Sequence, residues 1–168
     1  AFLTDSASDH LILVGAEASH PETDYGWIEP GPFLKTSGGP PIRRIAGFVE
    51  QPTTERAIGL MSSGGLWNTM VMIARAASLW RLIQDCSPDL AGYFSLLHAA
   101  IGTDREQDVL NEVYHTLPRT NFSTAVLAHC PERLLVLPMS KVLWSDWGRG
   151  ERIVDTLYRI KAPCLSAS

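Results

Sequence analysis

Polar side chains that could bind a ligand are grouped at four places in the sequence, near the ends of apolar runs. The groups are residues 22–26, residues 50–52, Asn68 and residues 146–148. Carboxylates and amides can hydrogen-bond the hydroxyls of a ligand, and a carboxylate can also bind a metal ion. In open α/β sheets, ligands bind outside the carboxyl ends of the strands. Each group alone is more often a turn than a site, but four groups together predict one ligand site at a sheet end.

Two of these residues stand in unusual surroundings. Asn68 lies within "GLWNTMVMI", where every neighbour except Thr69 is apolar. A buried amide must find hydrogen bonds, and its partner here is either the local backbone or a ligand hydroxyl. Asp146 stands between Trp144 and Trp147, a setting that a solvated surface acid does not need. The pattern favours a carboxylate that meets a metal or a phosphate.

Composition and missing motifs exclude several functions. The 168 residues are 45% hydrophobic and 19% charged, which is typical of one soluble domain with a real core. A net charge of −4 argues against a nucleic-acid partner. There is no apolar run of membrane-spanning length and no signal-peptide pattern, which predicts a cytoplasmic protein without a membrane partner. No G-x-S-x-G elbow is present, so serine hydrolysis is a poor fit. No G-x-G-x-x-G or G-x-x-x-x-G-K-[ST] motif is present, so the sequence shows no phosphate-binding glycine loop of its own.

The cysteines are scattered rather than paired in a motif. Cys86, Cys130 and Cys164 have no C-x-x-C spacing, so a zinc site is not expected. Their odd number and separation predict reduced thiols.

Apolar periodicity predicts an α/β chain, because strands alternate with helices. Residues 30–41 are rich in Pro and Gly and predict a loop. Thr103 and Glu106 form a capping box before a helix. The expected strands are 11–19, 42–50, 66–74, 133–139 and 141–144, with a further one around "YGWIE"; the expected helices are 52–61, 75–86, 88–101, 104–116, 123–129 and 149–160.

Four motifs in this order resemble the sugar-nucleotide pyrophosphorylases, and among them the mannose-1-phosphate guanylyltransferase branch. The motifs are "GAEASHPETDYGWIE", "FVEQP", "GGLWNTMVMIA" and "FSTAVLAHCPERLLVLPMSKVLWSDWG". The resemblance covers roughly residues 11 to 160. It implies a Rossmann-like, glycosyltransferase-A-like nucleotidyltransferase fold, in which a mixed sheet is flanked by helices. It also implies transfer of a nucleotidyl group, guanylyl from GTP in this branch, to a sugar 1-phosphate such as mannose 1-phosphate, with release of pyrophosphate.

The resemblance assigns roles to residues of this chain. Asp146 matches the catalytic, Mg²⁺-binding aspartate, and Gly148 leaves room beside it for the phosphates and the metal. The substrate-binding residues implied by the match are Glu22, Thr23, Tyr25, Gly26, Glu50, Gln51 and Asn68.

This chain departs from the family pattern at two of these motifs. Asp24 stands where the family usually has Gly, and Gln51 stands where it has a Lys that meets the sugar phosphate. A neutral amide supplies no positive charge, so weaker substrate binding is expected unless Arg43 or Arg44 substitutes.

The glycine-rich nucleotide loop and the upstream metal aspartate of the family are not found in residues 1–168. The chain is therefore interpreted as a single, N-terminally truncated domain, the sugar-phosphate-binding half. We expect the isolated chain to be inactive, and residues 11–19 and 66–74 to have exposed sheet edges through which it forms a homo-oligomer or pairs with another chain.

Three hypotheses remain open at this stage. The first is an enzyme of the guanylyltransferase type. The second is a non-catalytic subunit that senses a sugar nucleotide or regulates an active partner, an alternative favoured by Gln51 and Asp24. The third is an unrelated α/β domain.

Overall fold

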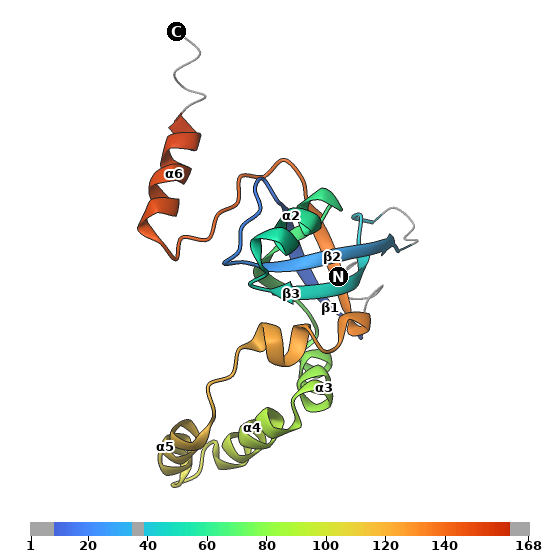
Figure 1. Cartoon of the computed structure of the whole chain (residues 1–168). Coiled ribbons are helices and arrows are strands. Elements are labelled where there is room, and N and C mark those ends of the chain that lie inside the picture. The colour runs from blue at the N-terminus through green and yellow to red at the C-terminus, as the bar shows by residue number, and fades with distance from the viewer. Residues whose placement is uncertain (1–8, 35–38, 162–168) are drawn as a thin grey trace.

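The computed structural model describes residues 9–34 and 39–161, and at its centre five strands form a small closed sheet (Figure 1). The strand order around the sheet is β1-β4-β2-β3-β5. The strands are β1 Leu11–Glu17, β2 Gly26–Phe33, β3 Arg43–Glu50, β4 Leu66–Ile73 and β5 Leu134–Met139. The helices are α2 Thr54–Ser62, α3 Ala76–Cys86, α4 Pro88–Ala100, α5 Glu106–Thr116 and α6 Gly150–Lys161, with short turns η1 Ser123–Leu127 and η2 Pro131–Arg133.

β1 is the central strand, and its burial follows from its neighbours. It runs parallel to β5 and antiparallel to β4, and every residue from Leu11 to Ala16 is buried. A strand covered on both faces reads as a continuous apolar run rather than an alternating one, as "LILVGA" does. The sheet therefore has both parallel and antiparallel pairs, and the expectation of an α/β chain with a mixed sheet is confirmed.

The expectation of exposed sheet edges is wrong for β1 and holds for part of β4. β1 has a partner strand on each side along its length. β4 pairs with β2 only at Leu66 and Trp67, whereas its pairing with β1 continues to Ile73. Among the described residues, β4 beyond Asn68 thus has β1 as its one partner strand, and Met70 and Val71 there are exposed.

The helices lie around the closed sheet in three groups. α2 covers one side of the sheet, while α3, α4 and α5 extend away from it (Figure 1). α6 follows β5 after a long extended segment and ends the described chain. No helix among the described residues is long and apolar enough to cross a membrane.

Several local expectations need correction. Residues 141–144 are not a strand: Lys141 has a left-handed φ of 58°, and the segment leaves the sheet. β2 runs on into the predicted loop as far as Phe33, because Pro30 lies beyond the residues that pair with β4 and its missing N–H costs nothing there. α5 begins at Glu106, and the Glu106 carboxylate accepts a hydrogen bond from the Gly102 amide instead of forming the expected capping box.

The prediction of reduced cysteines is also wrong for two of the three. Cys86, at the end of α3, forms a disulfide with Cys130. The bond joins segments 44 residues apart, a proximity that sequence spacing does not reveal. Cys164 lies outside the described residues.

Candidate functional site

All four polar groups from the sequence contribute residues to one hollow of about 430 Å³, called here the Glu50 hollow. It lies where β2 begins, β3 ends and β4 passes, and the segment after β5 closes it. From the predicted set it brings together Tyr25, Gly26, Glu50, Asn68 and Asp146. The prediction that distant segments converge on one pocket is therefore met for these five residues.

Glu50 and Gly26 lie against each other as partners in the β2–β3 ladder. The Glu50 Oε2 atom is buried and has no hydrogen-bond partner. A buried carboxylate oxygen without a hydrogen-bond donor lowers the stability of the fold. It therefore indicates that a donor, such as a ligand hydroxyl, is missing beside the hollow. A Cβ added to Gly26 would lie 2.6 Å from that oxygen, so only glycine leaves the carboxylate in this place.

The Asn68 side chain is 95% buried, and its polar atoms turn back onto its own strand. Its Oδ1 accepts a hydrogen bond from the Met70 amide at 3.2 Å, and its Nδ2 lies 2.9 Å from the Met70 sulfur. The contact is possible because Met70 has a left-handed φ of 58°, which bends the end of the strand. The local-backbone partner weighed from the sequence is thus present, while the residue also lines the hollow.

The Asp146 carboxylate lies at the rim of the same hollow, with its side chain 51% exposed. Gly148 donates its amide to Oδ1 at 2.8 Å, and the Asp146 amide donates to the Tyr25 hydroxyl at 3.2 Å. These two bonds fix the turn that carries the acid.

A second hollow of about 390 Å³, called here the Arg152 hollow, adjoins the first. Tyr25, Trp144 and Ser145 line both. The Tyr25 and Trp144 rings meet edge to face at 5.2 Å, and Trp67 packs against both. This aromatic group explains one of the two tryptophans that flank Asp146, whereas Trp147 is 56% exposed.

Glu22 lines the Arg152 hollow and shapes the loop before β2. Its Oε1 accepts the amides of Thr23 and Asp24 at 2.9 and 3.1 Å. Partial burial by itself would raise the pKa of Glu22, but the Asp24 amide, the charge of Arg152, the Thr23 amide and His20 together hold that pKa below its usual range. The carboxylate is therefore kept ionised.

Arg152, which was not among the predicted site residues, lies within 4 Å of three acids of the site. Its Nη2 lies 2.7 Å from Asp24 and 3.2 Å from Glu22, and its Nη1 lies 3.6 Å from Asp146. The guanidinium also stacks over the Tyr25 ring at 4.6 Å. Burial lowers the pKa of Arg152, but Tyr25, Glu22 and Asp24 outweigh it and raise the pKa above its ordinary value.

Other predicted residues lie outside the two hollows. Gln51 has an exposed side chain and a left-handed φ of 45°, and it lines neither. Thr23 contributes its backbone amide to Glu22 and also lines neither hollow. Arg43 donates to the carbonyl oxygens of Gly31 and Pro30, so it does not replace a phosphate-binding lysine here.

The carboxylates of the site could hold a magnesium ion only if substrate phosphates and water supplied its remaining ligands. Residues 9–34 and 39–161 contain no group of three or more His, Cys, Asp or Glu side chains that could hold a metal. Mg²⁺ commonly binds one or two carboxylates and takes its other ligands from phosphate and water. Asp146 is half exposed at the rim and matches that pattern as a single protein ligand.

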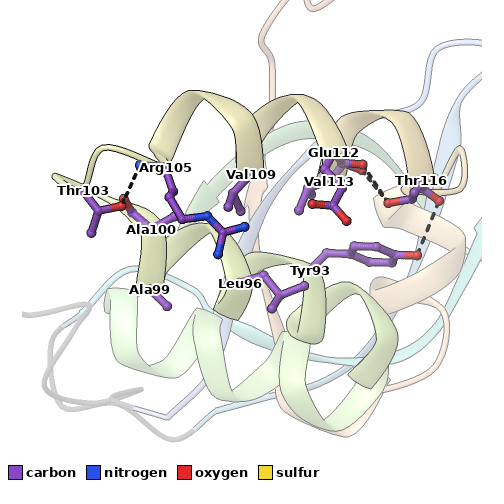
Figure 2. Close-up of a pocket in the computed structure, with 10 residues that line it drawn as sticks. All are labelled: Tyr93, Leu96, Ala99, Ala100, Thr103, Arg105, Val109, Glu112, Val113 and Thr116. Carbon is purple, nitrogen blue, oxygen red and sulfur yellow. Dashed lines mark hydrogen bonds between the residues drawn. The ribbon is translucent and has the colours of Figure 1, made fainter.

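A further hollow of about 480 Å³ lies between α4 and α5 (Figure 2). Its wall is mostly apolar, with Arg105 and Glu112 pointing into it and Tyr93 donating to the Thr116 carbonyl. It is remote in sequence from every predicted site residue, and nothing in it identifies an occupant.

No family model matches the chain. It is 28% identical over 153 residues to a mannose-1-phosphate guanylyltransferase of Sinorhizobium fredii, covering 88% of this chain and 28% of that relative. It is 30% identical over 142 residues to the alginate biosynthesis protein AlgA of Pseudomonas putida, covering 82% of this chain and 28% of that relative. The sequence resemblance to the guanylyltransferases is confirmed, and the chain spans less than a third of these relatives' length.

Two solved structures share the fold. One, from Thermus thermophilus and named as a mannose-1-phosphate geranyltransferase, has a TM-score of 0.66 and 28% identity, covering 82% of this chain and 37% of that one. The other, a mannose-6-phosphate isomerase from Helicobacter pylori, has a TM-score of 0.65, covering 84% of this chain and 54% of that one. At 16% identity the second likeness concerns the fold alone.

Proposed function

We propose that this chain is the sugar-phosphate-binding part of a nucleotidyltransferase that transfers guanylyl from GTP to mannose 1-phosphate and releases pyrophosphate. One observation carries the proposal. Glu50, Asn68, Gly26 and Asp146, which lie far apart in the sequence, line one hollow within a stretch similar to mannose-1-phosphate guanylyltransferases.

The chemistry of the Glu50 hollow supports a sugar as the ligand. The unpaired Glu50 oxygen can accept a hydrogen bond from a sugar hydroxyl, and Asn68, whose amide atoms also contact Met70, lines the same wall. Tyr25 and Trp144, whose rings meet edge to face, add aromatic wall to the same hollow. Because a missing partner for such a group costs about 1–3 kcal/mol, these contacts can separate one hexose epimer from another.

Asp146 supports phosphoryl chemistry at the rim. When bound, Mg²⁺ neutralises charge that develops on the transferred phosphoryl group and holds the reacting oxygens in line. Asp146 is the residue that would hold it, and Gly148 fixes the carboxylate through its amide. The Asp146 amide donates to the Tyr25 hydroxyl, so one hydrogen bond joins the proposed sugar wall to the proposed metal ligand.

One observation favours the alternative of a non-catalytic subunit that binds a sugar nucleotide. The Arg152 Nη1 atom lies 3.6 Å from Asp146, so a protein cation already stands beside the acid that a catalytic metal needs. The two functions share the sugar site and differ in turnover.

The test is an assay of the full-length protein for GDP-mannose formation from GTP and mannose 1-phosphate. The proposal predicts turnover, and Asn68→Ala should raise KM for the sugar phosphate more than KM for GTP. Binding of GDP-mannose without turnover would support the sensing subunit instead. An unchanged KM for sugar phosphate in Asn68→Ala would remove Asn68 from the sugar site.

A further inference from the structure

Acidic side chains outnumber arginines around the two hollows, so binding of an anionic ligand needs a source of positive charge. Six acids line the two hollows, and a sugar phosphate adds further negative charge; they are Glu22, Glu151 and Asp155 in the Arg152 hollow and Asp24, Glu50 and Asp146 in the Glu50 hollow. Phosphate groups in proteins are commonly bound by arginine, whose planar guanidinium matches their oxygen atoms. Gln51 supplies no charge and lies outside both hollows.

The cations that line the hollows within the described residues are Arg152 and Arg159. Arg159 pairs with Asp155 on its own helix at 2.8 Å, and its side chain is 46% exposed. Arg152 is only 16% exposed and faces the barrel loop and the aromatic wall. Arg152 is thus the cation that the fold holds inside the site.

The contacts of Arg152 leave part of its guanidinium available. Nη2 is engaged by Asp24 and Glu22. Nη1 approaches Asp146 at 3.6 Å, which is ion-pair distance but longer than a hydrogen bond. The two acids on one nitrogen fix the side chain while the other nitrogen keeps donors for a ligand.

A second, independent donor stands in the same hollow. Trp67 is 98% buried, lines the Arg152 hollow, and its indole Nε1 has no hydrogen-bond partner. An indole N–H can only donate, so its natural partner is an acceptor. An unpaired indole donor and a cation in the wall of one hollow together favour a ligand with acceptor oxygens, as a phosphate has.

We propose that Arg152 binds the phosphate group of the sugar phosphate, through Nη1, in the hollow that it shares with Trp67. The inference rests on the proposed function and adds a residue to it: the sugar ring lies toward Glu50 and Asn68, and its phosphate lies toward α6. Tyr25 and Trp144 line both hollows, so one ligand can reach from one to the other past them.

The experiment compares mannose 1-phosphate with mannose in the full-length protein, by NMR titration, for wild type, Arg152→Gln and Arg152→Lys. Removing a charge-assisted contact should weaken mannose 1-phosphate binding about 10- to 100-fold in Arg152→Gln. The affinity for mannose should stay within about twofold of wild type. The affinity of Arg152→Lys for mannose 1-phosphate should lie between those of wild type and Arg152→Gln, because lysine keeps the positive charge but lacks the paired donors of the guanidinium. Arg133→Gln is the matched control, because Arg133 pairs with Asp85 outside both hollows.

The outcomes separate the two proposals. Equal losses for both sugars in Arg152→Gln would make Arg152 a support of the Glu22 loop and overturn the inference, as would no loss at all. A wild-type protein that does not bind mannose 1-phosphate would overturn the proposed function and the inference together. Should Arg152→Gln not fold, the guanidinium ¹⁵N signal of Arg152 in wild type decides: it must shift with mannose 1-phosphate and not with mannose, and a shift with neither or with both overturns the inference.

Discussion

Gly26→Ala is the sharpest single test of the sugar site. Gly26 opens β2, and an alanine Cβ there would lie 2.6 Å from the Glu50 Oε2 atom and 2.9 Å from the Phe48 ring. Both distances are below normal contact, so a neighbour must move. Phe48 is buried in the core cluster, whereas Glu50 is half buried, so the carboxylate is the group that gives way.

The expected effect has two parts. Overpacking should lower the free energy of unfolding by about 1–3 kcal/mol. A displaced Glu50 carboxylate should lose its contact with a sugar hydroxyl, which weakens sugar-phosphate binding by about 5- to 150-fold. Calorimetric titration with mannose 1-phosphate measures the second part, and urea denaturation measures the first.

Gly59→Ala provides the matched control. Gly59 lies in α2, and an added Cβ would meet nothing within 4 Å. Alanine in a helix interior is favoured over glycine by about 0.5–1 kcal/mol, so this variant should be more stable and bind normally. A folded Gly26→Ala protein with wild-type affinity for the sugar phosphate would refute the role of Glu50.

Contacts at the rim and in the loop before β2 give three more tests. Asp146→Asn should nearly abolish GDP-mannose formation while leaving sugar-phosphate affinity close to wild type; wild-type turnover would exclude Asp146 as the metal ligand. Tyr25→Phe removes the acceptor of the Asp146 amide and should lower kcat about 2- to 10-fold, measured in the same assay, and an unchanged kcat would show that the bond does not position the acid. The Glu22 pKa is lowered on folding, so its contribution to stability is present above its unfolded value of about 4.5 and is lost as pH falls through the folded value. The difference in unfolding free energy between wild type and Glu22→Gln should therefore shrink below pH 4.5, and a constant difference would reject the linkage.

The polar groups at strand ends were predictable because their surroundings restrict them. Asn68 stands in an apolar run, and Glu50 and Gly26 each stand at the end of a strand, so the sequence indicates both their burial and their direction. Their meeting in one hollow follows from the ladder between β2 and β3 and from the passage of β4 beside β2. The fold class was predictable because short apolar runs, typical of buried strands, alternate with segments of helical apolar periodicity.

The closure of the sheet and the disulfide were not predictable from local pattern. Closure depends on β3 pairing with β5 through Arg43 and Arg44, two residues that the sequence marks only as charged. The disulfide depends on Cys86 and Cys130 meeting across a loop whose path local propensity does not set. Residues 141–144 were predicted as a strand from their β propensity, but the structure does not pair them with another strand. Propensity alone therefore does not make a strand here.

Arg152 was missed because helical periodicity directs attention to apolar residues. In α6 Thr156 is buried and Arg152, four positions earlier, is 16% exposed, while Leu157 and Ile160 are exposed. A signal was present: Arg149 and Arg152 follow Asp146 at intervals of three, and Arg149 also pairs with Asp24 at 2.7 Å. Cations at helical spacing after a proposed metal ligand are therefore worth weighing as site residues.

The charge balance of the site gives Arg152 and a metal complementary roles. Arg152 lies near Glu22, Asp24 and Asp146, so a phosphate competes with protein carboxylates for the same guanidinium. The competition is weakest at Asp146, where the separation is largest, and that is the carboxylate that the proposed Mg²⁺ would bind. Asp146 would hold the Mg²⁺, which would supply positive charge there, and the Nη1 donors of Arg152 would then be available to the phosphate. If Arg152 binds the phosphate as proposed, α6 would supply the positive charge that Gln51 lacks.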